Sequence, residues 1–160
     1  MQTLDLEKPT ALKLYKLGGQ EIRDLLISKY GTELFCAKII DRVTSYEDAY
    51  ELADKQTREE CKIYPATDSP DIVAYKKLKL VIKVINEDWF ADYNEPNQKK
   101  YYAWFRVLPS GSGFDFSDTN YICVSSDAAV GVRLCFETRE KCEYVAKQFT
   151  QLYEAFLLTK

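Results

Sequence analysis

Residues 97–106 read NQKKYYAWFR and bring two lysines, one arginine and four aromatic rings into ten positions. In a strand, successive side chains point to opposite faces. The side chains expected to face a core are Tyr101, Ala103, Phe105 and Val107. The opposite face is expected to carry Tyr102, Trp104 and Arg106. This second face is the larger and more polar one, so it is the first candidate for contact with another molecule.

Helical patterns fill most of the chain before this strand. Helices are expected over residues 9–17, 20–30, 44–53 and 70–86. Thr44 and Glu47 have the spacing of a capping box, which predicts the start of the helix over 44–53. The fourth opens at Pro70 and carries an apolar stripe wide enough to be buried. Residues 38–43 fit either a strand or a helix, and residues 54–68 show little periodicity and are expected to form a loop.

The C-terminal half predicts a sheet covered by a helix. Two further strands are expected at 120–124 and 132–136, and the glycine-rich segment 109–113 supplies a turn. Thr138 is the expected cap of a long helix with apolar residues every three or four positions. Those residues are Cys142, Val145, Phe149, Leu152 and Phe156. Such a stripe needs an apolar partner, most simply one face of the sheet.

The predicted fold is therefore α+β. It consists of N-terminal helices, an antiparallel meander of three or slightly more strands, and a long C-terminal helix packed on the sheet. A chain of 160 residues fits a single domain, 1–160, with a helical part over about 9–86 and the sheet and last helix over about 100–157. The composition is 46% apolar and 29% charged, which is typical of an ordinary globular protein.

Several kinds of activity have no support in the residues. Histidine, the usual group for proton transfer near neutral pH, is absent, so we expect no catalytic site; a carboxylate-dependent enzyme is the third hypothesis. The five cysteines are dispersed without a CxxC pair, so we expect reduced thiols, no bound metal and no cofactor. No apolar run approaches the ~20 residues of a membrane span, and we expect a cytoplasmic protein without membrane contact.

Four aromatic residues are the candidate partner-binding surface. Trp89 and Phe90 begin an acidic loop of about a dozen residues, and Tyr102 and Trp104 lie on the polar face of the strand. Tryptophan and tyrosine dominate interface energetics, so these rings suit a protein partner. The alternatives are that Trp104 packs under the loop or a helix, and that Trp89 and Phe90 cap the end of the preceding helix.

The same strand supports a second hypothesis, a single-stranded nucleic-acid site. Bases would stack on two of its rings while three cations contact phosphates. The residues of this alternative site are Lys99, Lys100, Tyr102, Trp104 and Arg106. A formal net charge of −3 means that the long-range basic field of a typical nucleic-acid binder is missing.

Three segments resemble a family of small uncharacterised proteins encoded by phages, prophages and mobile elements of Bacteroidetes. They lie at 39–54, 74–105 and 130–156, in the same order as in the family. The matching positions are Arg42, Val43, Tyr46, Glu47, Asp48, Ala49, Asn86, Trp89, Lys100, Tyr101, Tyr102, Trp104, Phe105, Arg133, Leu134, Phe136, Tyr144, Lys147, Gln148 and Phe149. Ala103 and Val132 stand where many members have proline and serine.

The resemblance implies a setting and supplies no mechanism. It implies an accessory protein that binds and modulates a host or phage macromolecule in the cytoplasm of the bacterial host. Inhibition of a host defence system, in the manner of an anti-CRISPR or another counter-defence protein, is the role that this setting suggests. A host or phage protein is thus the expected partner, with single-stranded nucleic acid as the alternative.

Overall fold

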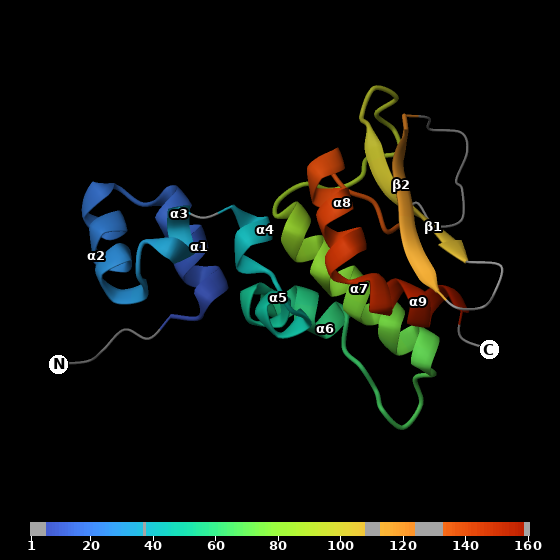
Figure 1. The fold of residues 1–160 in the computed structure, drawn as a ribbon. Helices are drawn as coiled ribbons and strands as arrows, with labels where there is room; N and C mark the ends of the chain where they lie inside the picture. The colour runs from blue at the N-terminus through green and yellow to red at the C-terminus, as the bar shows by residue number, and fades with distance from the viewer. Residues whose placement is uncertain (1–5, 37, 108–112, 124–132, 159–160) are drawn as a thin grey trace.

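The computed structural model describes residues 6–36, 38–107, 113–123 and 133–158. It confirms the α+β class: helices make up most of the described chain, and a two-stranded antiparallel hairpin lies at one side of the molecule (Figure 1). The helices are α1 Lys8–Leu17, α2 Gln20–Tyr30, α3 Glu33–Cys36, α4 Ile39–Arg42, α5 Tyr46–Leu52, α6 Lys55–Glu60, α7 Pro70–Asn86, α8 Arg139–Gln148 and α9 Thr150–Leu158. The strands of the hairpin are β1 Lys100–Val107 and β2 Phe114–Ile122.

Two local predictions in the helical half were wrong. The capping box of α5 uses Ser45 and Asp48, one residue later than Thr44 and Glu47: the Ser45 hydroxyl accepts the Asp48 N–H at 3.1 Å, and the Asp48 carboxylate accepts the Ser45 N–H at 2.9 Å. The segment expected to be a loop contains α6, because the carboxylate of Asp54 caps it by accepting the N–H of Thr57 at 2.6 Å. That cap starts a helix too short and polar to show apolar periodicity.

The main core is built around α7. Leu78, Val81 and Ile85 on this helix are completely buried, as the apolar stripe predicts. One side of α7 packs against α5 and α6, and α8 and α9 contact another side. Figure 1 shows α7 crossing the body, with α9 alongside it and the hairpin beyond.

The sheet is smaller than the predicted meander. β1 and β2 pair antiparallel with a bulge, because Trp104 faces Asp118 whereas Phe105 faces Phe116. Of the third strand, the described residues show one isolated bridge, in which Tyr101 and Phe136 exchange backbone hydrogen bonds of 3.0 and 2.8 Å. Residues 108–112 and 124–132, with most of the expected turn, lie outside the described residues.

The long C-terminal helix is interrupted at Phe149. α8 begins as predicted, with the Thr138 hydroxyl accepting the N–H of Lys141 at 3.2 Å, and ends before α9. Both helices cover the core face of the hairpin: ring contacts join Phe105 to Tyr153 at 4.5 Å. This confirms that the C-terminal helical region packs on one face of the sheet. Neither α8 nor α9 covers the opposite face of the hairpin.

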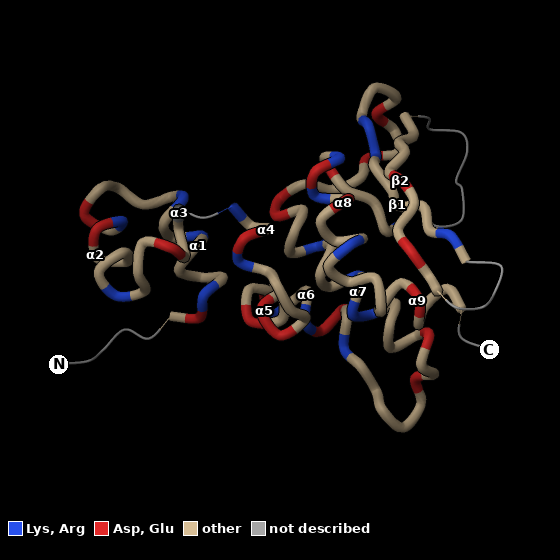
Figure 2. Tube along the Cα trace, in the orientation of Figure 1, with Lys and Arg blue, Asp and Glu red and all other residues tan. Residues whose placement is uncertain are grey.

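Charge is dispersed over the described chain, because segments with Lys and Arg and segments with Asp and Glu are interspersed along it (Figure 2). The described chain therefore has no concentrated basic region that would attract phosphate over a long range. Among the described residues, no helix combines the length and the apolar character that crossing a membrane requires.

Candidate binding surface

Strand alternation places the candidate rings of β1 on one face. Tyr101, Ala103 and Phe105 pack against the core, as predicted, while Val107 at the strand end is 58% exposed. The side chains between them define the outer face of the hairpin. We use this name for Tyr102, Trp104 and Arg106 of β1 together with their β2 neighbours Asp118 and Asn120.

Trp104 is the most exposed ring of the outer face. It is 53% exposed, and its ring centroid lies 6.2 Å from that of Tyr102, which is half-buried. The prediction that the indole is packed under the loop or a helix is therefore not what the structure shows. Two large rings instead stand side by side on a sheet surface, where an approaching apolar group can contact both.

The β2 side of the outer face is polar. Asp118 lies opposite Trp104, and Asn120 lies opposite Tyr102. The Asp118 side chain is 74% exposed, and its carboxylate lies 3.5 Å from the guanidinium of Arg139 on α8. The rings are therefore bordered by a carboxylate with one exposed cationic partner, which weakens any local attraction for phosphate.

The edge of β2 is partly closed to another strand. The backbone N–H of Thr119 donates to the Asp118 carboxylate at 2.7 Å, and that of Tyr121 donates to the Asn120 side-chain oxygen at 2.8 Å. A strand added to this edge would need donors that these side chains already occupy. The outer face is consequently better suited to a partner that docks on its rings than to one that extends the sheet.

The three cations of the nucleic-acid hypothesis occupy different environments. Lys100 is completely buried: its ammonium donates to the Gln98 carbonyl at 3.1 Å and lies 5.4 Å from the ring centroid of Tyr93. The Lys99 ammonium lies 4.7 Å from the ring centroid of Tyr121. Arg106 is exposed and faces Asp115 across the strands. Lys99 and Arg106 thus remain as surface cations, and the charge of Lys100 is not at the surface.

Trp89 and Phe90 lie on the loop that follows α7. Trp89 is half-buried and its backbone N–H donates to the Asn86 carbonyl at 3.0 Å, whereas Phe90 is 73% exposed. The side chain of Gln98 closes this loop, donating to the Phe90 carbonyl at 3.0 Å and accepting the N–H of Asp92 at 2.7 Å. Within the described residues, no ring contact joins Trp89 or Phe90 to the Tyr102 and Trp104 pair.

Sequence reasoning did not single out the groups around Lys100. Tyr93 lies over its ammonium and hydrogen-bonds to the thiol of Cys135, and desolvation by burial raises the pKa of the Tyr93 hydroxyl to about 12. Cys135 is 4% exposed, and burial also raises the pKa of its thiol. The bridge between Tyr101 and Phe136 brings Cys135 beside β1, and no local pattern signals a contact between segments so far apart in sequence.

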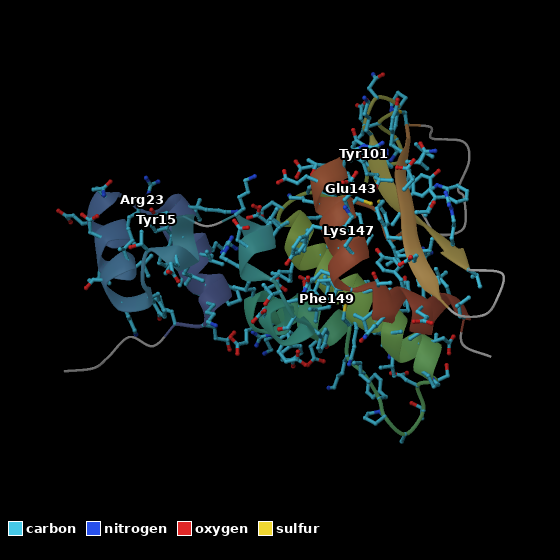
Figure 3. The ribbon with its side chains drawn as sticks, viewed as in Figure 1. Tyr15, Arg23, Tyr101, Glu143, Lys147 and Phe149 are labelled. Carbon is cyan, nitrogen blue, oxygen red and sulfur yellow. The ribbon has the colours of Figure 1, made fainter. Side chains whose placement is uncertain are left out.

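An open hollow beside α8 is one concave feature of the described surface. It is lined by Ile40, Arg139, Glu140, Glu143, Tyr144 and Lys147. Glu143 and Lys147 stand on α8 in Figure 3, and Arg139 pairs with Glu143 at 3.3 Å. Arg139, Glu140 and Glu143 form ion pairs with other charged side chains, an arrangement typical of a solvated surface. The Lys147 ammonium lies 5.5 Å from the ring centroid of Phe116. No three metal-ligating side chains of His, Cys, Asp or Glu converge in the described part of the chain.

Comparison with protein-family models, curated proteins and solved structures gave no significant match.

Proposed function

We propose that this protein is a non-enzymatic, phage-type accessory protein that binds a host or phage protein through the outer face of its hairpin. The target class that we propose is a component of a host defence system, which the protein inhibits by occupying one of its surfaces. The setting comes from the sequence resemblance, and the choice of surface comes from the geometry of the hairpin.

The exposure of Trp104 is the observation that carries the proposal. An indole that is 53% exposed beside a second ring leaves apolar area in water that burial against a partner would remove. Tryptophan and tyrosine are also the residues most often found at the energetic centre of protein interfaces. The covered core face and partly closed β2 edge leave the two rings as an accessible apolar feature of the outer face.

The surroundings of the rings suggest the chemistry of the partner. Asp118 borders Trp104 on β2, and its side chain is 74% exposed. A partner with an apolar pocket for the indole and a basic group at the rim would complement this arrangement. The rim charge is expected to affect the association rate and its salt dependence more than the final affinity.

Capture from a bacterial lysate with matched variants tests the proposal. Wild-type protein, Trp104→Ala and Leu157→Ala are immobilised in equal, folded amounts and exposed to lysate of a Bacteroidetes host. Leu157 is a suitable control because it is 51% exposed and lies on α9. We expect at least one host protein to be retained by wild type and Leu157→Ala and lost with Trp104→Ala. Equal retention by all three proteins contradicts the proposed surface.

Single-stranded nucleic acid is the second candidate ligand because two neighbouring rings have surface cations nearby. Stacking contributes about 1–3 kcal/mol per base, so Tyr102 and Trp104 could support weak binding with Lys99 and Arg106. Fluorescence anisotropy of a labelled single-stranded oligonucleotide at low salt tests whether the protein binds nucleic acid. Binding that weakens with salt and is lost in Trp104→Ala favours this ligand, whereas no change in anisotropy eliminates it.

A further inference from the structure

The first three helices form a unit with little core of its own. The main core begins at Ile39 and includes no residue of α1, α2 or α3. Within residues 6–35, only Ala11 and Leu26 are buried. Figure 1 shows these helices as a lobe to one side of the body, at the end far from the hairpin. A unit of about 30 residues buries too little surface to be stable on its own.

Specific contacts nevertheless hold the three helices together. The Tyr15 ring stacks on Phe35 with centroids 4.4 Å apart, and the Arg23 guanidinium lies 5.6 Å from the Tyr15 ring and donates to its carbonyl at 3.1 Å (Figure 3). Contacts to the body include exposed ion pairs, such as the pair between Lys16 and Asp88 at 3.1 Å. Exposed pairs of this kind contribute little stability.

Four large aliphatic side chains remain exposed where α1 meets α2. We call Leu14, Leu17, Ile22 and Leu25 the α1–α2 apolar patch; they are 37%, 78%, 46% and 64% exposed. Leu14 and Leu17 are three residues apart on α1, as are Ile22 and Leu25 on α2. The two halves meet at Gly18, since a methyl group there would lie 2.7 Å from the Leu14 carbonyl and 2.8 Å from Ile22.

The charges beside the patch are opposite on its two halves. Lys13 precedes Leu17 by four residues, and Glu21 precedes Leu25 by four, so each charge lies one helical turn from an exposed leucine. Both are exposed, and neither forms an ion pair with another described residue. On α2, Arg23 is held against Tyr15 and Asp24 accepts a hydrogen bond from Gln20, so Glu21 is the acid left beside the exposed leucine. A patch that is apolar at its centre, with an unpaired cation on one helix and an unpaired carboxylate on the other, is complementary to itself after a two-fold rotation.

We propose that the α1–α2 apolar patch docks onto the same patch of a second copy of this chain. The two hairpins pack as four helices, and the two-fold rotation sets α1 of one copy against α2 of the other. Lys13 of each copy then lies on the side where the other copy carries Glu21, and the exposed leucines supply the buried centre. The interface lies at the opposite end of the molecule from the outer face of the hairpin, so a dimer leaves both outer faces open.

Light scattering coupled to size-exclusion chromatography tests this dimer directly. We expect wild type to approach twice the chain mass of 18.6 kDa as the concentration rises from micromolar to submillimolar. The double variant Leu17→Glu, Leu25→Glu should remain at the mass of one chain, with far-UV circular dichroism confirming that it is folded. Leu157→Glu, an equally drastic change on α9, should dimerise as wild type does.

A charge swap distinguishes specific dimerisation from non-specific hydrophobic association. Lys13→Glu should weaken dimerisation by roughly tenfold through like-charge repulsion, and the double swap Lys13→Glu, Glu21→Lys should restore it. This pair of variants changes only exposed side chains, so it remains informative if the leucine variants do not fold. A single-chain mass for wild type at every concentration overturns the proposal, and so does a swap that fails to restore the dimer.

Discussion

The side-chain amide of Asn86, at the end of α7, donates a hydrogen bond to the backbone carbonyl of Cys135 at 2.9 Å. Its oxygen accepts the N–H of Glu137 at 3.2 Å, so one buried amide binds the chain on both sides of Phe136. The same chain segment is bridged to Tyr101 of β1. Asn86 therefore links the central helix to the segment where sequence analysis expected a third strand.

Replacing Asn86 should be costly for stability. In Asn86→Ala, a buried carbonyl and a partly buried N–H lose their partner, which should lower the free energy of unfolding by about 2–4 kcal/mol. Urea unfolding followed by circular dichroism measures the change, with Asn94→Ala on the exposed loop as control. A loss below about 0.5 kcal/mol, the size of an ordinary surface effect, contradicts this role.

Replacing the buried cation Lys100 should be tolerated. Lys100→Met keeps the packed aliphatic stem and removes an ammonium whose hydrogen-bond partner in the described structure is the Gln98 carbonyl. We expect the free energy of unfolding to equal or exceed that of wild type, and binding by the outer face to be unchanged. A loss above about 3 kcal/mol in the same urea assay shows instead that the charge holds the loop in place.

Acid should weaken the start of α5 through Asp48. Hydrogen bonds from Thr44 and then Ser45 hold the pKa of its carboxyl below the ordinary value. Because these bonds exist only in the folded protein, their contribution is complete above the unfolded pKa of about 3.9 and is lost as the pH falls through the lower, folded-state pKa. Asp48→Asn should therefore show a flatter decline of the urea midpoint below about pH 4. An identical decline in both proteins contradicts the assignment.

The buried thiols should resist alkylation in the folded protein. Burial raises the pKa of the Cys142 thiol to about 12 and also raises the pKa of Cys61 and Cys135. Thiolate is the reactive form, so all three should react far more slowly than half-exposed Cys123 at pH 8. Peptide mass spectrometry after timed iodoacetamide treatment gives the order, and urea should abolish the difference. Cys142 reacting as fast as Cys123 in native buffer contradicts the burial.

Local patterns predicted the elements whose burial follows a simple period. The stripe of α7 and the alternation of β1 were readable because a helix or strand with one buried face imposes a spacing of 3.6 or 2 residues. The position of Trp104 on the outer face follows from that alternation. Its exposure required the structure, since either a helix or the loop could have covered it.

Features that depend on contacts between distant segments were not readable. The register of β2 depends on pairing with β1 across a bulge. α6 is a separate case, because its cap at Asp54 is local and the helix is too short and polar to show apolar periodicity. Lys100 looks like a surface cation in the sequence because its neighbours are polar, yet Tyr93 and Gln98 of the preceding loop cover it. Long-range packing decides such cases, and no single-sequence period encodes it.

Fluorescence of Trp104 alone tests the central claim most directly. The chain has two tryptophans, so Trp89→Phe leaves one emitter on the outer face of the hairpin. We predict strong quenching by acrylamide in the free protein and quenching reduced several-fold when the host protein captured from lysate is bound. A Trp104 that is already shielded in the free protein, or one that is quenched equally with and without the captured protein, contradicts the account.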